Sequence, residues 1–554
     1  MPPADDTAPP ASAPLGKDAA PAFPPAGPGA DADTDAWDAF HGRHAQRHVD
    51  LWMRLLADKL DNPEADRDRR FGAAEWRAST PHDYLRQAYL INADWLQQAV
   101  ARWPADPATR RRLAFFTRQL IDALCPANFP ATNAEALKRM AETEGRSLQE
   151  GVRNLLDDIR RRRISMTDES AFEVGRNLAI TPGTVVYENE LFQLIQYAPA
   201  GERVRERPLL IVPPFINKYY ILDLQPENSF VRYALEQGLQ VFLISWRNVG
   251  PELGGATWDD YLDQVVFRAL DITLEIAGTQ RLNALGFCVG GTLLASGLAL
   301  LRARRDRRVA SLTLLTTLLD FAEPGDIGVY VQEPFVAQKE AEFAGGGVMR
   351  GAELAQAFAS LRANELVWNY VVNNYLKGQA PPPFDLLYWN SDSANVPGAL
   401  FAFYLRRMYL DNALRLPGAL LMRGTRVDLR RIDVPTFVLA ARDDHIVPWR
   451  SAFASARLLS GRIEFVLAAS GHIAGVINPA AKKRRSHWTG AFGHRNAEDW
   501  MAEARSHAGS WWPRWAAWLR RRSGKTVAAP AAPGSGRYPP IEPAPGRYVR
   551  VRHE

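Results

Sequence analysis

The chain has 554 residues, of which 47% are hydrophobic and 16 are tryptophan, so it can build a large globular core over more than one domain's length. Its 67 basic and 62 acidic side chains give a net charge of +5, which provides no case for nucleic acid as the main partner. The only two cysteines, Cys125 and Cys288, argue against a disulfide framework and suit a reducing compartment.

The first part of the chain is predicted to hold a leader and a helical domain. Residues 1–33 are mostly Ala, Pro, Gly and Asp, a composition that cannot bury enough apolar area to fold, so we expect a disordered leader. It begins with neither a basic region nor an apolar run, so no secretory signal is predicted. Over 34–175, apolar residues recur at three- and four-residue spacing and predict an α-helical N-terminal domain. Basic clusters at 110–112 and 160–163 fit solvated helix faces or contacts with an acidic partner.

From residue 176 onward the hydrophobic pattern changes. A period of two at 181–187 and 191–197 predicts an antiparallel hairpin. Apolar runs then alternate with helical stretches, which predicts a mostly parallel sheet with helices on both faces. The runs are 209–212, 241–245, 282–286, 312–316, 436–440 and 464–467. We therefore expect residues 176–554 to form one α/β domain.

Two long stretches interrupt this pattern. More than a hundred residues separate the fourth run from the fifth, so we interpret about 318–430 as an insertion. Aromatic and amide side chains at 366–375 and 387–390 suit a cap over an active site, and an ordinary helical subdomain with an aromatic core is compatible with this. The uncharged run 284–301 has the length of a membrane helix, but its glycines and its place in the alternation favour a buried core, so no transmembrane segment is expected.

The third run leads into Gly286-Phe287-Cys288-Val289-Gly290, a spacing typical of the nucleophile elbow of α/β-hydrolases, with sulfur in place of the usual serine oxygen. This sharp strand-to-helix turn accepts only small residues two before and two after the nucleophile. The N–H of Val289 would then bind an oxyanion, and the helix dipole would favour a thiolate. The motif alone is weak, because a structural cysteine between glycines looks the same.

An elbow nucleophile requires an acid and then a histidine after later strands. Asp443 and Asp444 follow the fifth run and His472 follows the sixth, so the order is nucleophile, acid, histidine. His472 would accept the thiol proton, and an aspartate would orient the imidazole. Asp443 and Asp444 compete for the role of the acid, and His445 competes with His472.

The second oxyanion donor is expected in the loop that follows the first run, residues 213–218. Proline has no N–H, which leaves Ile216, our choice, or Phe215. A cysteine acyl-enzyme is a thioester, about as activated as an acyl-CoA, so sulfur suits acyl transfer better than hydrolysis if water is excluded. The ten histidines show no metal-ligand spacing, so no metal is expected.

Seven specific segments span nearly the whole chain beyond the leader. They are ANFPATN (127–133), PPFINKYYILDL (213–224), SWRN (245–248), GFCVGG (286–291), DHIVPW (444–449), GHIAGVINP (471–479) and EPAPGRYV (542–549). On these segments the chain resembles the poly(3-hydroxyalkanoate) synthases of class I, the short-chain, single-subunit type. One departure is Val249-Gly250, where that family tends to have Pro-Asp.

The resemblance implies that Cys288 is the nucleophile, Asp444 the acid and His472 the base. It implies short-chain (R)-3-hydroxyacyl-CoA substrates such as 3-hydroxybutyryl-CoA, with the CoA thioester as substrate and no cofactor. Released CoA, a polyester growing on a granule surface in the cytoplasm and a homodimer are also implied, and granule-associated proteins could bind the N-terminal region. Whether Asp444 takes the proton of the attacking hydroxyl directly is left open.

Several interpretations stay open. The predicted substrate contacts are Phe215, Asn217, Tyr220 and Trp389. The same triad would also serve a thioesterase or another acyltransferase, and a non-catalytic granule-binding protein could carry it as a relict. A group of tryptophans near the C-terminus forms either a surface for polymer or a partner, or a helix packed on the sheet. These are Trp511, Trp512, Trp515 and Trp518.

Overall fold

The computed structural model describes residues 34–62 and 67–552. The predicted leader, residues 1–33, lies outside the described residues. The chain divides into two compact units, Met1–Arg118 and Gln119–Glu554. The predicted limit of the helical domain, residue 175, therefore lies inside the second unit.

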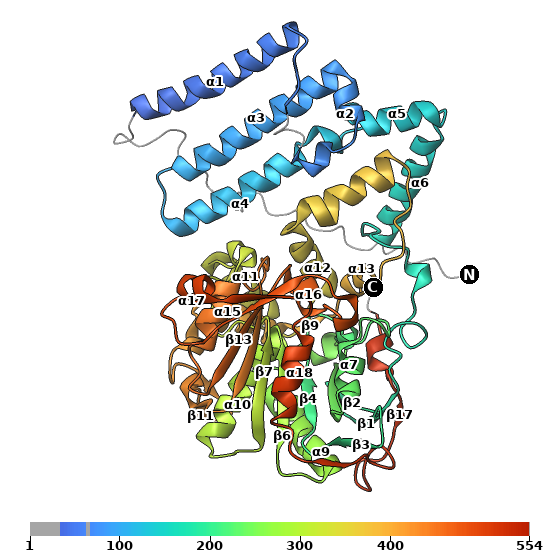
Figure 1. The fold of residues 1–554 in the computed structure, drawn as a ribbon, viewed down its shortest axis with the longest axis vertical. Helices are drawn as coiled ribbons and strands as arrows, with labels where there is room; N and C mark the ends of the chain where they lie inside the picture. The colour runs from blue at the N-terminus through green and yellow to red at the C-terminus, as the bar shows by residue number, and fades with distance from the viewer. Residues whose placement is uncertain (1–33, 63–66, 553–554) are drawn as a thin grey trace, which may run out of the picture. The chain divides into compact units, whose positions relative to one another are not determined.

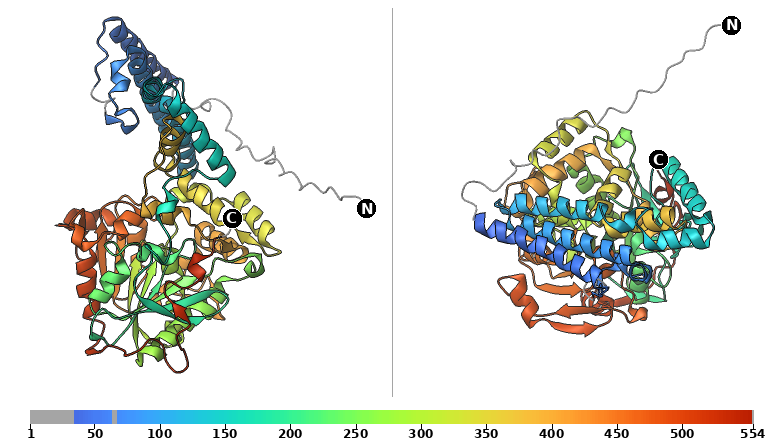
Figure 2. Two further views of the ribbon diagram at one scale, coloured as in Figure 1. Left: turned by 90° about the vertical axis from the view of Figure 1, so that its right-hand side faces the viewer. Right: turned by 90° about the horizontal axis from the view of Figure 1, so that it is seen from above.

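Helices make up most of the described part of the first unit. Helices α1 (Thr34–Leu56) and α3 (Thr80–Arg102) run side by side in Figures 1 and 2. The short helices η2 (Arg69–Phe71) and α2 (Glu75–Ala78) lie between them in sequence, and α4 (Pro107–Ala123) continues into the second unit. The second unit begins with η3 (Pro126–Asn128), α5 (Ala134–Glu142) and α6 (Arg146–Arg161). The predicted helical N-terminal region is confirmed.

An eleven-stranded sheet organises the rest of the second unit (Figure 1), in the order β15-β14-β13-β12-β7-β6-β4-β5-β2-β1-β17. The central strands from β13 to β5 are parallel, and the strands at both edges are antiparallel. The strands are β1 (Gly183–Glu188), β2 (Phe192–Tyr197), β4 (Leu209–Val212), β5 (Val241–Trp246), β6 (Leu282–Phe287), β7 (Val309–Leu315), β12 (Thr436–Ala441), β13 (Ile463–Ala468), β14 (Ser486–Thr489), β15 (Arg505–Ala508) and β17 (Glu542–Pro543). A separate two-stranded ladder joins β3 (Arg203–Arg205) to β16 (Thr526–Ala528).

Helices cover both faces of the sheet, which is why its central strands are apolar throughout. Leu210 and Val212 of β4 enter one core, and Leu209 and Ile211 enter the other. The first core includes residues of α8 (Trp258–Asp260), α9 (Arg268–Ala277), α10 (Val289–Ala303), α15 (Trp449–Ala456) and α17 (Ala497–Glu503). The second includes residues of α7 (Phe230–Glu236), α16 (His472–Val476) and α18 (Trp512–Arg520). This layering is the α/β class that the alternation predicts.

The tryptophans near the C-terminus belong to the second core. Trp511 and Trp515 are 0% exposed, Trp512 is 2% and Trp518 is 7%. Trp515 Nε1 donates to the hydroxyl of Thr313 in β7 at 3.1 Å. Their interpretation as a helix packed on the sheet is confirmed, and a polymer-binding surface at this place is wrong.

The predicted insertion lies between β7 and β12 and is mostly helical. Its α-helices are α11 (Glu333–Phe343), α12 (Gly351–Ser360), α13 (Asp385–Ser391) and α14 (Gly398–Phe403). It also holds the π-helices η9 (Asn364–Trp368), η10 (Val371–Leu376) and η11 (Tyr404–Leu410), a rare helix type that is frequent at functional sites. Its strands pair as β8 (Val348–Met349) with β9 (Val396–Pro397) and β10 (Leu421–Met422) with β11 (Thr425–Arg426). Within 34–62 and 67–552, we find no helix with the length and apolar character needed to cross a membrane.

Candidate active site

Cys288 lies at the turn between β6 and α10. Its backbone has φ 53° and ψ −127°, a left-handed value that is uncommon for a residue with a side chain. A methyl group on Gly286 would meet the backbone of Gly291, and one on Gly290 would meet the carbonyl oxygens of Val212 and Pro213. The structure therefore has the sharp strand-to-helix turn that the spacing predicts, and the glycines are needed because backbone approaches at both positions.

His472 and Asp444 contact each other directly. Asp444 Oδ2 lies 2.7 Å from His472 Nδ1, and both side chains are almost fully buried. Asp444 Oδ1 accepts the N–H groups of Ile446 at 2.9 Å and Val447 at 2.8 Å. Asp443, the competing acid, is exposed. Of the two aspartates, it is therefore Asp444 that contacts His472.

The surroundings of His472 favour its charged form. Burial alone would lower the pKa, but the negative charges of Asp444 and Cys288, and the hydrogen bonds to both, raise the pKa of His472 to about 10. The imidazole also stacks on Phe287, with ring centroids 5.8 Å apart. Asp444 and Cys288 thus both act on the imidazole of His472 and favour its protonated form.

His445, the competing histidine, has different neighbours. Its Nδ1 accepts a hydrogen bond from Arg362 Nε at 3.4 Å, and Arg362 also donates to the Asp443 carbonyl at 3.3 Å. Burial and then the charge of Arg362 lower the pKa of His445 to about 4. His445 therefore contacts Arg362, and its surroundings favour the neutral imidazole.

The 213–218 loop follows β4, next to the turn that holds Cys288. Val289, the other predicted oxyanion donor, is the first residue of α10, where helix geometry leaves N–H groups without intrahelical partners. The Ile216 carbonyl accepts the N–H of Ala394 at 3.2 Å, which ties the loop to the insertion. Trp246 Nε1 donates to the Pro213 carbonyl at 2.9 Å. The loop is therefore held from both sides.

The predicted substrate contacts have partners within the protein. Phe215 is buried against Trp246, the Tyr220 hydroxyl donates to Asp392 at 2.8 Å, and Trp389 Nε1 donates to the Lys218 carbonyl at 2.7 Å. Asn217 forms an isolated bridge with Ser393 of the insertion. Their assignment as substrate contacts stays a prediction.

Two tyrosines near Cys288 were not among the predicted residues. Tyr404 and Tyr409 stack edge-to-face in η11, with ring centroids 5.2 Å apart. Burial raises the pKa of both hydroxyls, and Cys288 adds to the shift at each. In an α-helix, residues five positions apart point in different directions, whereas the wider turn of a π-helix brings them closer to the same face. The sequence was interpreted with α-helical spacing, which therefore did not predict that Tyr404 and Tyr409 would be in contact.

The residues described hold no group of three or more His, Cys, Asp and Glu side chains suited to a metal ion. The groups available for chemistry are the thiol, the imidazole, the carboxylate and the tyrosine hydroxyls. This set suits nucleophilic attack and proton transfer.

Two family models match the chain. The model described as Poly-beta-hydroxybutyrate polymerase (PhaC) N-terminus matches residues 67–234, and the model described as alpha/beta hydrolase fold matches residues 207–479. The poly(3-hydroxyalkanoate) polymerase subunit PhaC of Cupriavidus necator is 52% identical over 507 residues, which covers 91% of this chain and 86% of that protein. This chain belongs to the poly(3-hydroxyalkanoate) polymerase family.

Other polymerases of the family are also similar over most of their length. PhaC of Rhizobium meliloti is 43% identical over 524 residues, 92% of this chain and 85% of that protein. Among solved structures, a hydrolase from Pseudomonas aeruginosa PA01 is 20% identical, with 54% of this chain and 95% of that chain covered and a TM-score of 0.33. The family assignment confirms the resemblance stated from the sequence, and the matching hydrolase model confirms the fold class.

Proposed function

We propose that the chain polymerises (R)-3-hydroxyacyl-CoA into a polyhydroxyalkanoate and releases CoA, through an acyl group carried on Cys288. Membership of the polymerase family makes the chain an acyltransferase that forms polyhydroxyalkanoate. The observation that carries the mechanism is the contact of His472 Nδ1 with Asp444, together with the influence of the nearby Cys288 sulfur on the pKa of the same imidazole. The preference for a short chain such as 3-hydroxybutyryl rests on the resemblance to class I enzymes.

Loading of the enzyme is a thioester exchange. The Cys288 sulfur attacks the acyl carbonyl carbon, a new C–S bond forms, and the bond to the CoA sulfur breaks. The His472 imidazolium gives its proton to the departing CoA thiolate. The N–H groups of Val289 and Ile216 are the proposed donors to the oxyanion of the tetrahedral intermediate.

Chain growth is an ester-forming step at the same carbonyl. The 3-hydroxyl oxygen of a second (R)-3-hydroxyacyl-CoA attacks the thioester on Cys288, a C–O bond forms, and the C–S bond to Cys288 breaks, so that the lengthened chain is carried on that CoA and reloads Cys288 by the same thioester exchange. The hydroxyl proton passes to His472, which restores the imidazolium beside the thiolate. Water must be kept from the thioester for polymer to form, and aromatic side chains of the insertion such as Tyr404 and Tyr409 suit this role.

The proposed oligomeric state, cellular location and partners follow from the resemblance to class I enzymes. We propose a homodimer at the surface of cytoplasmic polymer granules, with (R)-3-hydroxyacyl-CoA and the growing polyester as partners and no bound cofactor. Contacts with granule-associated proteins through the N-terminal region belong to the same proposal.

The test is incubation of the purified full chain with (R)-3-hydroxybutyryl-CoA, scoring released CoA and insoluble polymer. We expect both products from the wild type and neither from Cys288→Ala. The matched control is Cys125→Ala, which changes the other cysteine and should keep both. CoA with soluble 3-hydroxybutyrate would indicate a thioesterase, and no CoA release by the wild type would indicate a non-catalytic protein.

A further inference from the structure

A buried ion pair connects the 213–218 loop to the insertion. Lys218 Nζ is 2.8 Å from Asp392 Oδ1, and the two side chains are only 4% and 2% exposed. Burial lowers the pKa of Lys218, and the charge of Asp392 opposes that shift. A buried charge that loses its partner is costly, so each of these residues depends on the other. Lys218 belongs to the loop and Asp392 to the insertion.

The C-terminal segment joins this pair. Lys218 Nζ also donates to the carbonyl of Val551 at 2.9 Å, and Arg552 Nε lies 3.4 Å from Asp392 Oδ1. The Arg552 guanidinium lies over the ring of Tyr388, 4.9 Å from its centroid. The last residues described thus contact both the loop and the insertion.

The backbone of the loop is tied to the same part of the insertion. The Ile216 carbonyl accepts from Ala394, and the Lys218 carbonyl accepts from Trp389. The Asp392 carboxylate accepts a hydrogen bond, at 2.8 Å, from the hydroxyl of Tyr220, which follows the loop. Polar contacts therefore flank Ile216, whose N–H is a proposed oxyanion donor.

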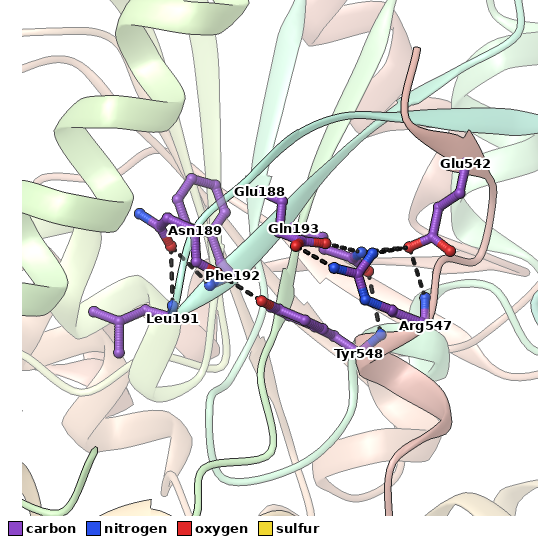
Figure 3. A network of polar contacts seen from close by, with 8 residues as sticks. All are labelled: Glu188, Asn189, Leu191, Phe192, Gln193, Glu542, Arg547 and Tyr548. Carbon is purple, nitrogen blue, oxygen red and sulfur yellow. Dashed lines mark hydrogen bonds and ion pairs between the residues drawn. The ribbon is translucent and has the colours of Figure 1, made fainter. Parts of the chain in front are cut away.

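A separate polar network holds the C-terminal segment against the first hairpin of the sheet (Figure 3). Arg547 pairs with Glu188 and Glu542, and the Tyr548 hydroxyl donates to the carbonyl of Asn189 at 2.8 Å. Glu188 belongs to β1, and Asn189 follows it in the first hairpin of the sheet. The network fixes the chain just before Val551.

We propose that Asp392 and the C-terminal residues Val551 and Arg552 position the 213–218 loop for acylation, by holding Lys218 and Tyr220. The inference rests on the proposed function, because it assigns these groups to the oxyanion donor of that reaction. They are positioning residues and do not touch the reacting atoms. Because the insertion and the C-terminal segment both contact this loop, the proposed oxyanion site depends on both segments.

The test compares two reactions of the same sulfur. Acylation by (R)-3-hydroxybutyryl-CoA needs the oxyanion donors, whereas alkylation of Cys288 by iodoacetamide is a direct displacement that forms no oxyanion. For Asp392→Asn we expect the initial rate of CoA release to fall about tenfold to a hundredfold, as for misplaced catalytic geometry. Alkylation of Cys288, followed by mass spectrometry of its peptide, should keep its wild-type rate.

Further variants separate positioning from folding. A chain that ends at Arg550 should show the same selective loss of acylation, and Tyr220→Phe a smaller one, since it removes one hydrogen bond without unpairing a charge. The matched control is Asp411→Asn, which removes an exposed ion pair with Arg407 in the same insertion and should leave both rates unchanged.

The outcomes separate the inference from the proposed function. Unchanged CoA release in Asp392→Asn and in the shortened chain would overturn the inference. So would an equal fall of acylation and alkylation in all variants, including Tyr220→Phe, since that indicates general loss of structure. A wild type that alkylates at Cys288 but releases no CoA would instead overturn the proposed function.

Discussion

Asp444 uses both of its carboxylate oxygens inside the protein. One accepts the N–H groups of Ile446 and Val447, and the other contacts His472. The carboxylate is therefore held in place from two sides, with little capacity left for the 3-hydroxyl of a substrate. Within the proposed mechanism, we assign orientation of the imidazole to Asp444 and proton transfer to His472.

Asp444→Asn should slow CoA release and polymer growth together. The asparagine oxygen would accept the two backbone N–H groups, so its amide nitrogen would face His472 Nδ1 as a donor and hold the imidazole in the wrong tautomer. We expect a loss of about 10³-fold or more in both steps, measured as the initial burst of CoA and the steady rate of polymer formation. A preserved burst with lost elongation would instead give Asp444 a direct role in activating the hydroxyl.

The pKa of His472 predicts how its contribution to stability changes with pH. The folded-state pKa of about 10 lies above the unfolded value of about 6.5, so the folded chain binds the proton more tightly. The stabilisation is then fully present below about pH 6.5 and is lost as the pH rises through about 10. The difference in thermal midpoint between wild type and His472→Asn should therefore shrink from pH 6 to pH 10.

His445 provides the control for this pH dependence because its shift has the opposite sign. Its folded pKa of about 4 lies below the unfolded value, so its contribution is present above about pH 6.5 and is lost as the pH falls through about 4. The difference between wild type and His445→Asn should change between pH 6.5 and pH 4, with little change up to pH 10. If both variants followed the same pH dependence, the assignment of the charged histidine would be wrong.

At the scale of elements, the turn between β6 and α10 depends on its neighbours as well as on its own residues. Gly290 faces the end of β4, where the Val212 and Pro213 carbonyls approach its Cα. The 213–218 loop begins there, so the backbone of the turn at Cys288 lies against the start of the loop that carries Ile216. The geometry of one therefore constrains the other.

Gly290→Ala should disturb both elements. The added methyl group would overlap two carbonyl oxygens that cannot move independently of the sheet, and overpacking of this kind costs roughly 1–3 kcal/mol. We expect lower CoA release and a lower thermal midpoint, measured on the same preparation. Gly255→Ala is the control, because that exposed glycine has open space at the added methyl group and should tolerate it. Full activity of Gly290→Ala would show that the turn can shift without loss.

At the scale of the whole molecule, the helical region of the second unit is part of the same structure as the insertion. The Tyr375 hydroxyl of η10 donates to Asp158 of α6 at 2.7 Å, and Asn154 Nδ2 donates to the carbonyl of Asn374 at 3.0 Å. Arg139 Nε of α5 donates to the carbonyl of Lys377 at 2.7 Å. Helices that the sequence pattern assigns to a separate N-terminal domain thus support the insertion.

Two shortened chains test this dependence. A chain that begins at Ala105 keeps α4, α5 and α6, whereas one that begins at Arg176 lacks all of them. We expect the second to have a thermal midpoint several degrees lower and to expose more of the insertion in hydrogen exchange around 371–377, because those backbone groups lose their partners. Equal protection of this segment in both chains would show that the insertion is stable without the helices.

Much of the fold follows from local patterns. The alternation of apolar runs with helical stretches predicts the central strands, because a strand buried on both faces must be apolar throughout. The extent of the insertion follows from the distance between two such runs. The tryptophans near the C-terminus could not be placed in this way, since aromatic side chains at helical spacing suit an exposed surface and a packed helix equally. Only the neighbouring strand, with Thr313 beneath Trp515, decided the matter.

By itself, the sequence determined the turn at Cys288 and the order in which Cys288, Asp444 and His472 follow the ends of strands, because a turn depends on residues a few positions apart and each strand end is marked by a local apolar run. Only the tertiary structure showed that Asp444, and not the exposed Asp443, contacts His472, and that His445 contacts Arg362 instead. The catalytic roles of these residues remain predictions. The tertiary structure alone joined Lys218 to Val551, which lies 333 positions away in sequence. Residues so far apart in sequence form no local pattern that could predict their contact. That Lys218 is buried, and therefore requires a partner for its charge, is known only from the folded structure.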